Sequence, residues 1–193
     1  MDKIIKIKKK LSRGFTLVET LVAISIFTVS ILSLMAVVSQ SITNTNYAKK
    51  KIIASYLAQE GVEYMRNLRD TFVLYSPTSQ EGWDDFDDML TSESCFASNG
   101  CYFDDQNLNY GDTSMPIVDI TLDGCSSSCP TLFYNETTGK YGYTGGVDSE
   151  YIRKIKVTTV SANELKVSST VYWKQGSGTY NMAFTENLFN WVE

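Results

Sequence analysis

The sequence predicts an α+β protein in which a long N-terminal helix packs on a C-terminal antiparallel β-sheet. Three observations carry this prediction. Residues 15–38 form an apolar segment with a single charge, residues 39–70 continue with helical periodicity and without proline, and residues 152–193 alternate in the manner of strands. A chain of 193 residues is also of the size expected for one domain.

The apolar segment 15–38 is long enough to cross a membrane. As a helix rising 1.5 Å per residue it would be roughly 36 Å long, against roughly 30 Å for the hydrocarbon core of a bilayer. The leader, residues 1–14, holds six Lys and Arg against one acid, Asp2. Because basic clusters stay on the cytoplasmic side, we expect a single pass through the cytoplasmic membrane with the rest of the chain outside.

Two simpler explanations of this N-terminus fit less well. A secretory signal peptide has an apolar stretch of roughly 7 to 15 residues and a small-x-small cleavage site, whereas residues 37–40 read Val-Val-Ser-Gln. An uncleaved anchor stays open as an alternative. Glu19 argues against it, because a charged, unpaired carboxylate inside a membrane segment is costly and requires a partner.

The junction Gly14-Phe15 resembles the leader of the type IV prepilin family, which is cut between glycine and phenylalanine and has glutamate as the fifth mature residue. Gly14, Phe15 and Glu19 match this pattern position by position. The resemblance implies that a prepilin peptidase cuts after Gly14 and methylates the amino group of Phe15. It further implies extraction from the membrane lipid by pilus assembly machinery and packing with other pilin subunits in an extracellular filament, where Glu19 neutralises a neighbour's amine.

The amphipathic continuation, residues 39–70, presents an apolar stripe that is expected to pack on the sheet. The stripe residues recur at helical spacing: Ile53, Leu57, Tyr64 and Leu68. Residues 15–69 would then form one helix of roughly 80 Å. With the sheet it would give the lollipop shape that the family resemblance also implies.

Helix breakers are scarce in this segment. Many pilins have a proline in the helix, where it lets the helix melt in part during assembly, but residues 23–68 contain none. Gly61 is the only helix breaker there, and we interpret it as a tolerated glycine costing roughly 1 kcal/mol rather than as a point of close approach for a strand. Local melting would have to depend on serines, namely Ser30, Ser33, Ser39 and Ser41.

Residues 58–70 resemble the second half of the helix in minor pilins often labelled type IV pilus modification protein. This resemblance implies a minor pilin that contributes to filament assembly, priming or adhesion. A pseudopilin of a type II secretion or DNA-uptake apparatus has the same N-terminus and is the first alternative. An anchored surface protein that never polymerises is the second.

Residues 71–151 are predicted to be a variable, loop-rich region. Trp83, Phe86 and Leu90 fall on one side of a short helix, and residues 132–143 read as a hairpin with a glycine-containing turn. The hairpin aromatics are expected to cover the sheet, with an exposed adhesive patch as the alternative. Three antiparallel strands follow at residues 152–160, 164–174 and 179–187.

The four cysteines form two close pairs, Cys95 with Cys101 and Cys125 with Cys129. In an exported chain disulfides are the expected state, and local pairing needs the least rearrangement among three possible connectivities. Each small loop would contribute roughly 2 to 2.5 kcal/mol. A four-thiolate zinc site is the alternative, although neither pair has the usual two-residue spacing.

A calcium site is the one metal hypothesis that we retain, and no other cofactor is expected. Oxygen-bearing side chains recur between residues 104 and 112, although the pattern does not fit an EF-hand. The candidate ligands are Asp104, Asp105, Asn107, Asn109 and Asp112. A solvated acidic turn explains the same residues. Asn135-Glu136-Thr137 is a formal glycosylation sequence.

Composition argues against catalysis and against nucleic-acid binding by the head. The chain has no histidine, which excludes Ser-His and Cys-His nucleophile pairs. Six of the 17 Lys and Arg and one of the 22 acids lie in the leader, so the chain from Phe15 has 11 bases against 21 acids. That sign disfavours contacts with phosphates. We therefore expect a structural and interaction protein.

Overall fold

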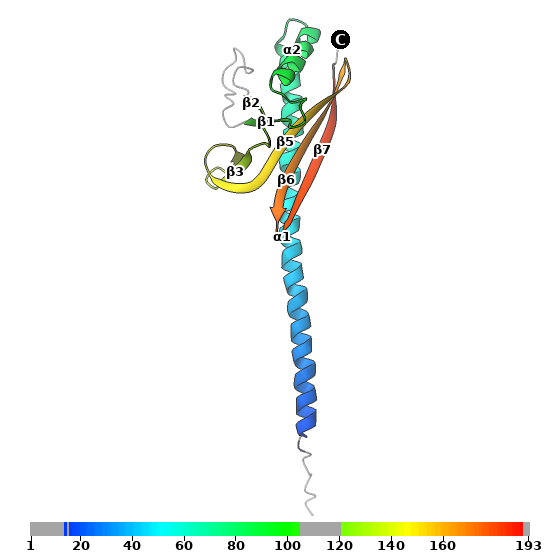
Figure 1. Cartoon of the computed structure of the whole chain (residues 1–193), viewed down its shortest axis with the longest axis vertical. Coiled ribbons are helices and arrows are strands. Elements are labelled where there is room, and N and C mark those ends of the chain that lie inside the picture. Colours follow the sequence, from blue (N-terminus) through cyan, green and yellow to red (C-terminus); the bar gives the residue numbers. More distant parts are fainter. Residues whose placement is uncertain (1–13, 15, 105–120, 191–193) are drawn as a thin grey trace, which may run out of the picture. The chain divides into compact units, whose positions relative to one another are not determined.

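The computed structural model describes residue 14, residues 16–104 and residues 121–190. The chain divides into two compact units, residues 1–46 and residues 47–193, and each is described by itself. Helix α1, Leu17–Tyr75, begins in the first unit and ends in the second. The predicted α+β fold, with a long N-terminal helix followed by an antiparallel sheet, is confirmed (Figure 1).

The first unit contains the apolar part of α1. Its large apolar side chains from Leu17 to Ile42 are exposed, and α1 is the one helix in the described ranges that is long and apolar enough to cross a membrane. An aqueous environment would leave this surface uncompensated, because burial of apolar surface is the main favourable term in folding. The segment therefore requires a bilayer or the apolar surface of other chains.

Helix α1 continues further than its sequence pattern indicates, to Tyr75 instead of about residue 70. The helix stops two residues before Pro77, where the residue before a proline is driven out of the helical region. Its last turns are held by tertiary packing, since the rings of Phe72 and Phe86 lie 6.1 Å apart. Within the second unit its buried positions are Ala54, Leu57, Ala58, Gly61, Val62, Met65, Leu68 and Arg69.

The second unit is built on an antiparallel sheet whose centre is the long strand β5, Val147–Ser161. One edge of β5 pairs with β6, Glu164–Gln175, which pairs in turn with β7, Gly178–Phe189. The other edge pairs with β3, Thr131–Asn135, and through Ile155 with β1, Cys101–Asp104. The outer partners are β4, Lys140–Gly142, next to β3, and β2, Thr121–Gly124, next to β1.

Sequence alternation located the C-terminal strands well. The three predicted strands correspond to β5, β6 and β7, which are longer than expected by six, one and three residues. Alternate positions of β6 from Leu165 to Trp173 are all buried, whereas in β5 the alternation ends at Val157 and Thr159 is exposed. The predicted hairpin is β3–β4, and Gly139 adopts a positive φ of 70° in its turn. Strands β1 and β2 lie in the region expected to be mainly loops.

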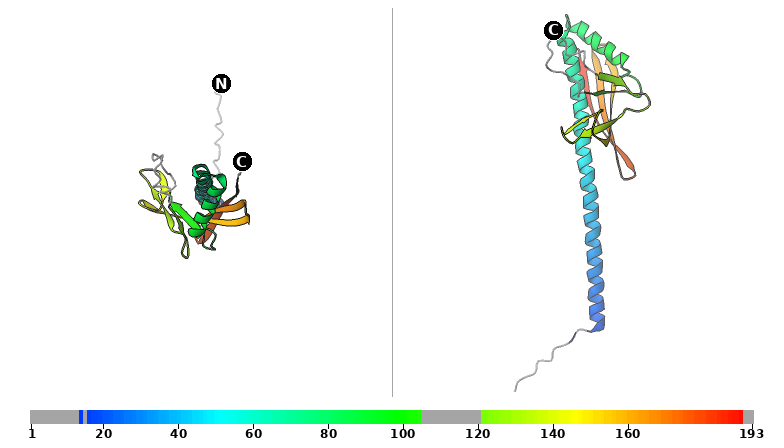
Figure 2. Two further views of the ribbon diagram at one scale, coloured as in Figure 1. Left: turned by 90° about the horizontal axis from the view of Figure 1, so that it is seen from above. Right: turned by 90° about the vertical axis from the view of Figure 1, so that its left-hand side faces the viewer.

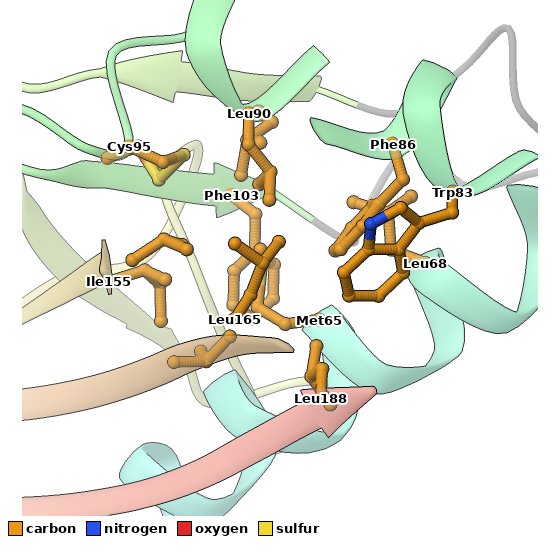
Figure 3. Close-up of a cluster of buried hydrophobic side chains, with 14 residues drawn as sticks. Met65, Leu68, Trp83, Phe86, Leu90, Cys95, Phe103, Ile155, Leu165 and Leu188 are labelled. Carbon is orange, nitrogen blue, oxygen red and sulfur yellow. A yellow bond between two sulfur atoms is a disulfide. The ribbon is translucent and has the colours of Figure 1, made fainter. Parts of the chain in front are cut away.

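Helix α2, Ser79–Ser92, contains the predicted short helix and closes one end of the core. Thr78 caps it, because its side chain accepts a hydrogen bond from the Glu81 N–H. Trp83, Phe86 and Leu90 are buried, as expected from their spacing. Figure 3 shows these side chains pointing toward Met65 and Leu68 of α1 and toward Leu165 and Leu188 of the sheet.

A second apolar cluster covers the other end of the sheet. Its buried members come from α1 and from β3, β5 and β6: Ala54, Leu57, Ala58, Leu132, Tyr151, Val171 and Trp173. Tyr141 and Tyr143, from the hairpin and the residues after it, pack against this cluster. The packed position of these two aromatics supports the covering role that the sequence analysis preferred to an adhesive patch.

Gly61 of α1 contradicts the sequence-based interpretation. A Cβ placed there would lie 2.8 Å from Ile155 Cδ1 and 2.9 Å from Ser169 Cβ, and it would overlap Ser169 Oγ. Ile155 and Ser169 are fully buried, so they have little room to move aside. Gly61 is therefore not merely a tolerated glycine. Because it has no side chain, α1 can lie close to the sheet at this position.

Arg153 is a buried cation that joins the helix to the sheet. Arg153 of β5 donates from Nη1 to Glu60 Oε2 of α1 at 2.6 Å and from Nη2 to the Phe103 carbonyl oxygen at 3.3 Å. Its guanidinium carbon lies 3.7 Å from the centre of the Phe103 ring, which stacks on Tyr64. A buried charge needs such a set of partners, because an unpaired one would be strongly destabilising.

The two disulfides join Cys95 to Cys101 and Cys125 to Cys129, which is the local pairing that the sequence analysis favoured. Cys95 and Cys101 are fully buried in the core beside Phe103, whereas Cys125 and Cys129 lie at its margin.

We expect Cys125→Ala/Cys129→Ala to lower the free energy of unfolding by about 2 kcal/mol, the entropy of one small loop. Cys95→Ala/Cys101→Ala should cost more, by about 1 to 3 kcal/mol, because it also leaves a void in the core. Urea denaturation of both variants would measure the difference, and equal losses would contradict it.

Tyr151 makes a pH-dependent contribution to stability. It is 4% exposed, and its hydroxyl donates to the Lys50 carbonyl oxygen at 3.2 Å. Burial, and to a lesser degree Tyr141 and Glu150, raise the pKa of Tyr151 to about 12. Because an unfolded tyrosine ionises near pH 10, unfolding releases a proton between pH 10 and 12 and the stabilisation is lost as the pH rises through this range. We expect the parent chain to lose about 2 kcal/mol more than Tyr151→Phe between pH 9 and pH 12, measured by denaturation at both values.

Candidate functional site

The candidate site is the start of α1. The helix begins at Leu17, and Thr16 acts as its N-cap, because Thr16 Oγ1 accepts the Glu19 N–H at 3.2 Å and the Thr16 carbonyl oxygen accepts the Thr20 N–H at 3.2 Å. Thr16 and Glu19 have the spacing of a capping box, in which the side chain at the third helical position complements the cap. This cap was not predicted, although its spacing can be read from Thr16-Leu17-Val18-Glu19.

Gly14 lies before the helix and is exposed. A Cβ added at Gly14 would meet no atom within 4 Å among the described residues. The fold of this chain therefore does not require glycine at position 14, so any requirement for it belongs to a protein that binds this segment. Phe15, the other residue of the predicted cleavage site, lies outside the described residues.

Glu19 is the one acidic residue of the first turn of α1 and is exposed. A carboxylate in the first turn favours the helix, because the N–H groups of that turn carry partial positive charge. None of the ion pairs found among the described residues includes Glu19. The carboxylate is thus exposed on the surface of α1, where it is the one charged group within residues 16–38.

The five Ser and Thr hydroxyl groups between residues 17 and 38 bind to α1 itself. Each donates to a carbonyl oxygen three or four residues earlier, as the Ser30 hydroxyl does to Ile26 O and the Ser33 hydroxyl does to Val29 O, both within 2.9 Å. Such back-bonding satisfies polar groups where no water is present. The helix is continuous through these serines, including Ser39 and Ser41.

Comparison with known proteins bears on this N-terminal segment. Residues 9–36 match the family model described as the prokaryotic N-terminal methylation motif, which includes Gly14, Phe15 and Glu19. In this segment the chain is similar to type IV pilin-like precursors. Searches of the curated proteins and of the solved structures each found no match to the chain.

The methylation motif implies processing by a prepilin peptidase and assembly with other pilins. Proteins of this type are typically structural rather than catalytic. For a pilin-like precursor, the exposed apolar half of α1 is consistent with anchoring in a membrane.

The calcium hypothesis stays a prediction. Asp104, at the end of β1, is buried, whereas Asp105, Asn107, Asn109 and Asp112 lie outside the described residues. Within the two described ranges and residue 14, no group of three or more His, Cys, Asp or Glu is placed to hold a metal ion. Because all four cysteines are joined in disulfides, thiolate ligands for the alternative zinc site are absent from this state of the chain.

Proposed function

We propose that this pilin-like precursor is a minor type IV pilin, a structural subunit of a pilus-like filament that contributes to assembly, priming or adhesion. The observation that carries the proposal is the methylation motif at residues 9–36, followed by a helix whose apolar side chains are exposed. A surface of that kind is stable only in lipid or against similar helices. A filament core of packed helices supplies the second environment once the chain leaves the membrane.

The proposed mechanism follows from the start of α1. A prepilin peptidase cuts after Gly14, which lies outside the helix, and methylates the new amino group of Phe15. The ammonium then stands next to an apolar helix, where a charge without a partner is costly. Glu19 of one subunit supplies the opposite charge for the amine of its neighbour, which fixes the position of one helix against the next.

The first test is the processing step itself. The full chain is co-expressed in a bacterial membrane with a prepilin peptidase, and the product is analysed by mass spectrometry and N-terminal sequencing. We expect a chain that begins with methylated Phe15. An intact leader, or a cut after Val38, would overturn the proposal in favour of an anchored or secreted protein.

Gly14→Val is the matched control for this test. Because a side chain at position 14 meets nothing within the described residues, this variant should fold and insert like the parent chain. We expect it to accumulate with its leader intact. Co-purification of the processed chain with pilus fibres would support a minor pilin, whereas co-purification with a secretion system would show a pseudopilin instead.

A further inference from the structure

The outer face of the sheet carries a set of lysines without carboxylate partners. Alternation along β5 and β6 places Lys154, Lys156, Lys166 and Lys174 on the face opposite to the buried core positions. None of them takes part in the ion pairs found among the described residues. Over residues 152–189 the same face carries one carboxylate, Glu164, which accepts from Asn187. In a chain of net negative charge this basic face is exceptional.

Helix α2 presents the opposite charge. Its sequence contains no Lys or Arg. Four of its acids are exposed: Glu81, Asp84, Asp85 and Asp88. Burial, together with the negative charge of Asp88 and Asp84, raises the pKa of the half-buried Asp87. No ion pair within the described residues neutralises them.

The basic and acidic surfaces lie on opposite sides of the second unit. Helix α2 packs through Trp83, Phe86 and Leu90 on the inner face of the sheet, so its acidic side is directed away from the sheet. The view from above shows α1 and α2 together on one face of the strands (Figure 2). The lysines occupy the other face. The second unit is therefore basic on one side and acidic on the other.

Two of the four lysines, Lys156 and Lys166, lie at the same end of the sheet as α2. The Trp83 indole N–H of α2 donates to the Ala162 carbonyl oxygen at 3.1 Å, in the turn between β5 and β6. Lys156 and Lys166 lie close to this turn, on neighbouring strands, since Lys166 is paired with Thr158. A second copy of this unit, placed beside the sheet face, can therefore bring its acidic α2 next to these lysines.

We propose that the lysine face of one copy of this chain binds the acidic side of α2 of a second copy. Opposite potentials on the two surfaces favour this pairing over contact of either surface with itself, because like charges repel. The contact joins two different surfaces, so it can repeat in one direction and form a row or helical filament rather than a closed dimer.

The inference rests on the proposed assembly function, but the contact is tested on the uncleaved chain, without peptidase. Two differently tagged full-length copies are co-expressed in a bacterial membrane, one with Thr158→Cys on the sheet face and one with Thr91→Cys on α2. Both positions are exposed, and all four native cysteines are in disulfides, so the new thiols are the free ones. A short bismaleimide then links thiols that lie close together.

We expect the 158–91 pair to give at least five times more linked heterodimer than the matched 158–158 and 91–91 pairs. Adding Lys156→Glu/Lys166→Glu to the copy that carries Thr158→Cys should abolish the excess. Asp84→Lys/Asp85→Lys on the partner copy should restore it, because the charges are again opposite. High salt should weaken the parent contact.

Equal linking of all three pairs would overturn the proposal, since it would show random collision or association through α1 alone. If Asp84→Lys/Asp85→Lys did not restore the link, the proposal would also be overturned, because the lysines of the sheet face would then not pair with the acids of α2. The linking test and the cleavage test can fail independently. If the copies are linked but prepilin peptidase does not cut the chain, the contact is supported and the pilin function is wrong. If the chain is cut but the copies are not linked, the pilin function is supported and the contact is wrong.

Discussion

Gly61→Val is expected to lower the free energy of unfolding by about 3 kcal/mol, the upper range for overpacking a closed core. The new side chain would enter the space between α1 and strands β5 and β6, where even a Cβ would lie 2.8 Å from Ile155 Cδ1 of β5. The better helix propensity of valine offsets only about 0.4 kcal/mol of this loss. A shift of α1 along its axis would move all of its buried side chains at once. The helix therefore cannot relieve the strain by moving, and the strain stays at position 61.

Chemical denaturation of the full chain in detergent, followed by tryptophan fluorescence, would measure this effect. Gln59→Val is the matched control, because it adds a valine to the same helix at an exposed position. That control should change stability by less than about 0.5 kcal/mol. If Gly61→Val were as stable as Gln59→Val, the close approach of α1 to Ser169 would be wrong.

The role of Gly61 could not be predicted from its own neighbourhood in the sequence. A glycine lowers helix propensity by the same amount whether it faces solvent or a strand. The deciding residues, Ile155 and Ser169, are about a hundred positions away, and their approach depends on the register of β5 against β6. Tertiary contacts of this kind leave no local pattern.

The strands differ in predictability for a physical reason. Strands β5 to β7 are long, with alternate positions buried in β5 and β6 and mostly half-buried in β7, so alternation repeats often enough to be recognised. Strands β1 and β2 have four residues each and lie among polar residues. The first is held by the disulfide of Cys101 and by one pair with Ile155, which no periodicity reveals.

The candidate site was more accessible to sequence reasoning than the fold of the middle region. Gly14, Phe15 and Glu19 are close in sequence, and their chemistry depends on spacing along one chain. The capping role of Thr16 was missed, although it obeys an equally local rule. In contrast, the lysine face of the sheet becomes visible only when the pairing of β5 and β6 is known.

Glu19→Gln is expected to leave cleavage after Gly14 intact but to reduce incorporation into filaments at least tenfold. Glutamine supports the capping box as well as glutamate does, so the helix should still begin at Leu17 with Thr16 as its cap. What the variant loses is the negative charge. The ammonium group of a neighbouring Phe15 would then remain without a counter-ion among apolar helices, at a free-energy cost that opposes assembly.

The comparison of Glu19→Gln with Glu19→Ala separates the two roles of this residue. Alanine removes both the charge and the capping side chain, whereas glutamine removes the charge alone. If charge pairing governs assembly, the two variants should be equally absent from sheared fibres, measured by immunoblotting against the amount of processed chain in the membrane. Normal incorporation of Glu19→Gln, with Glu19→Ala excluded, would show instead that Glu19 acts through the start of the helix. A neighbour's amine would then need another partner, and within residues 16–38 no second carboxylate exists to provide it.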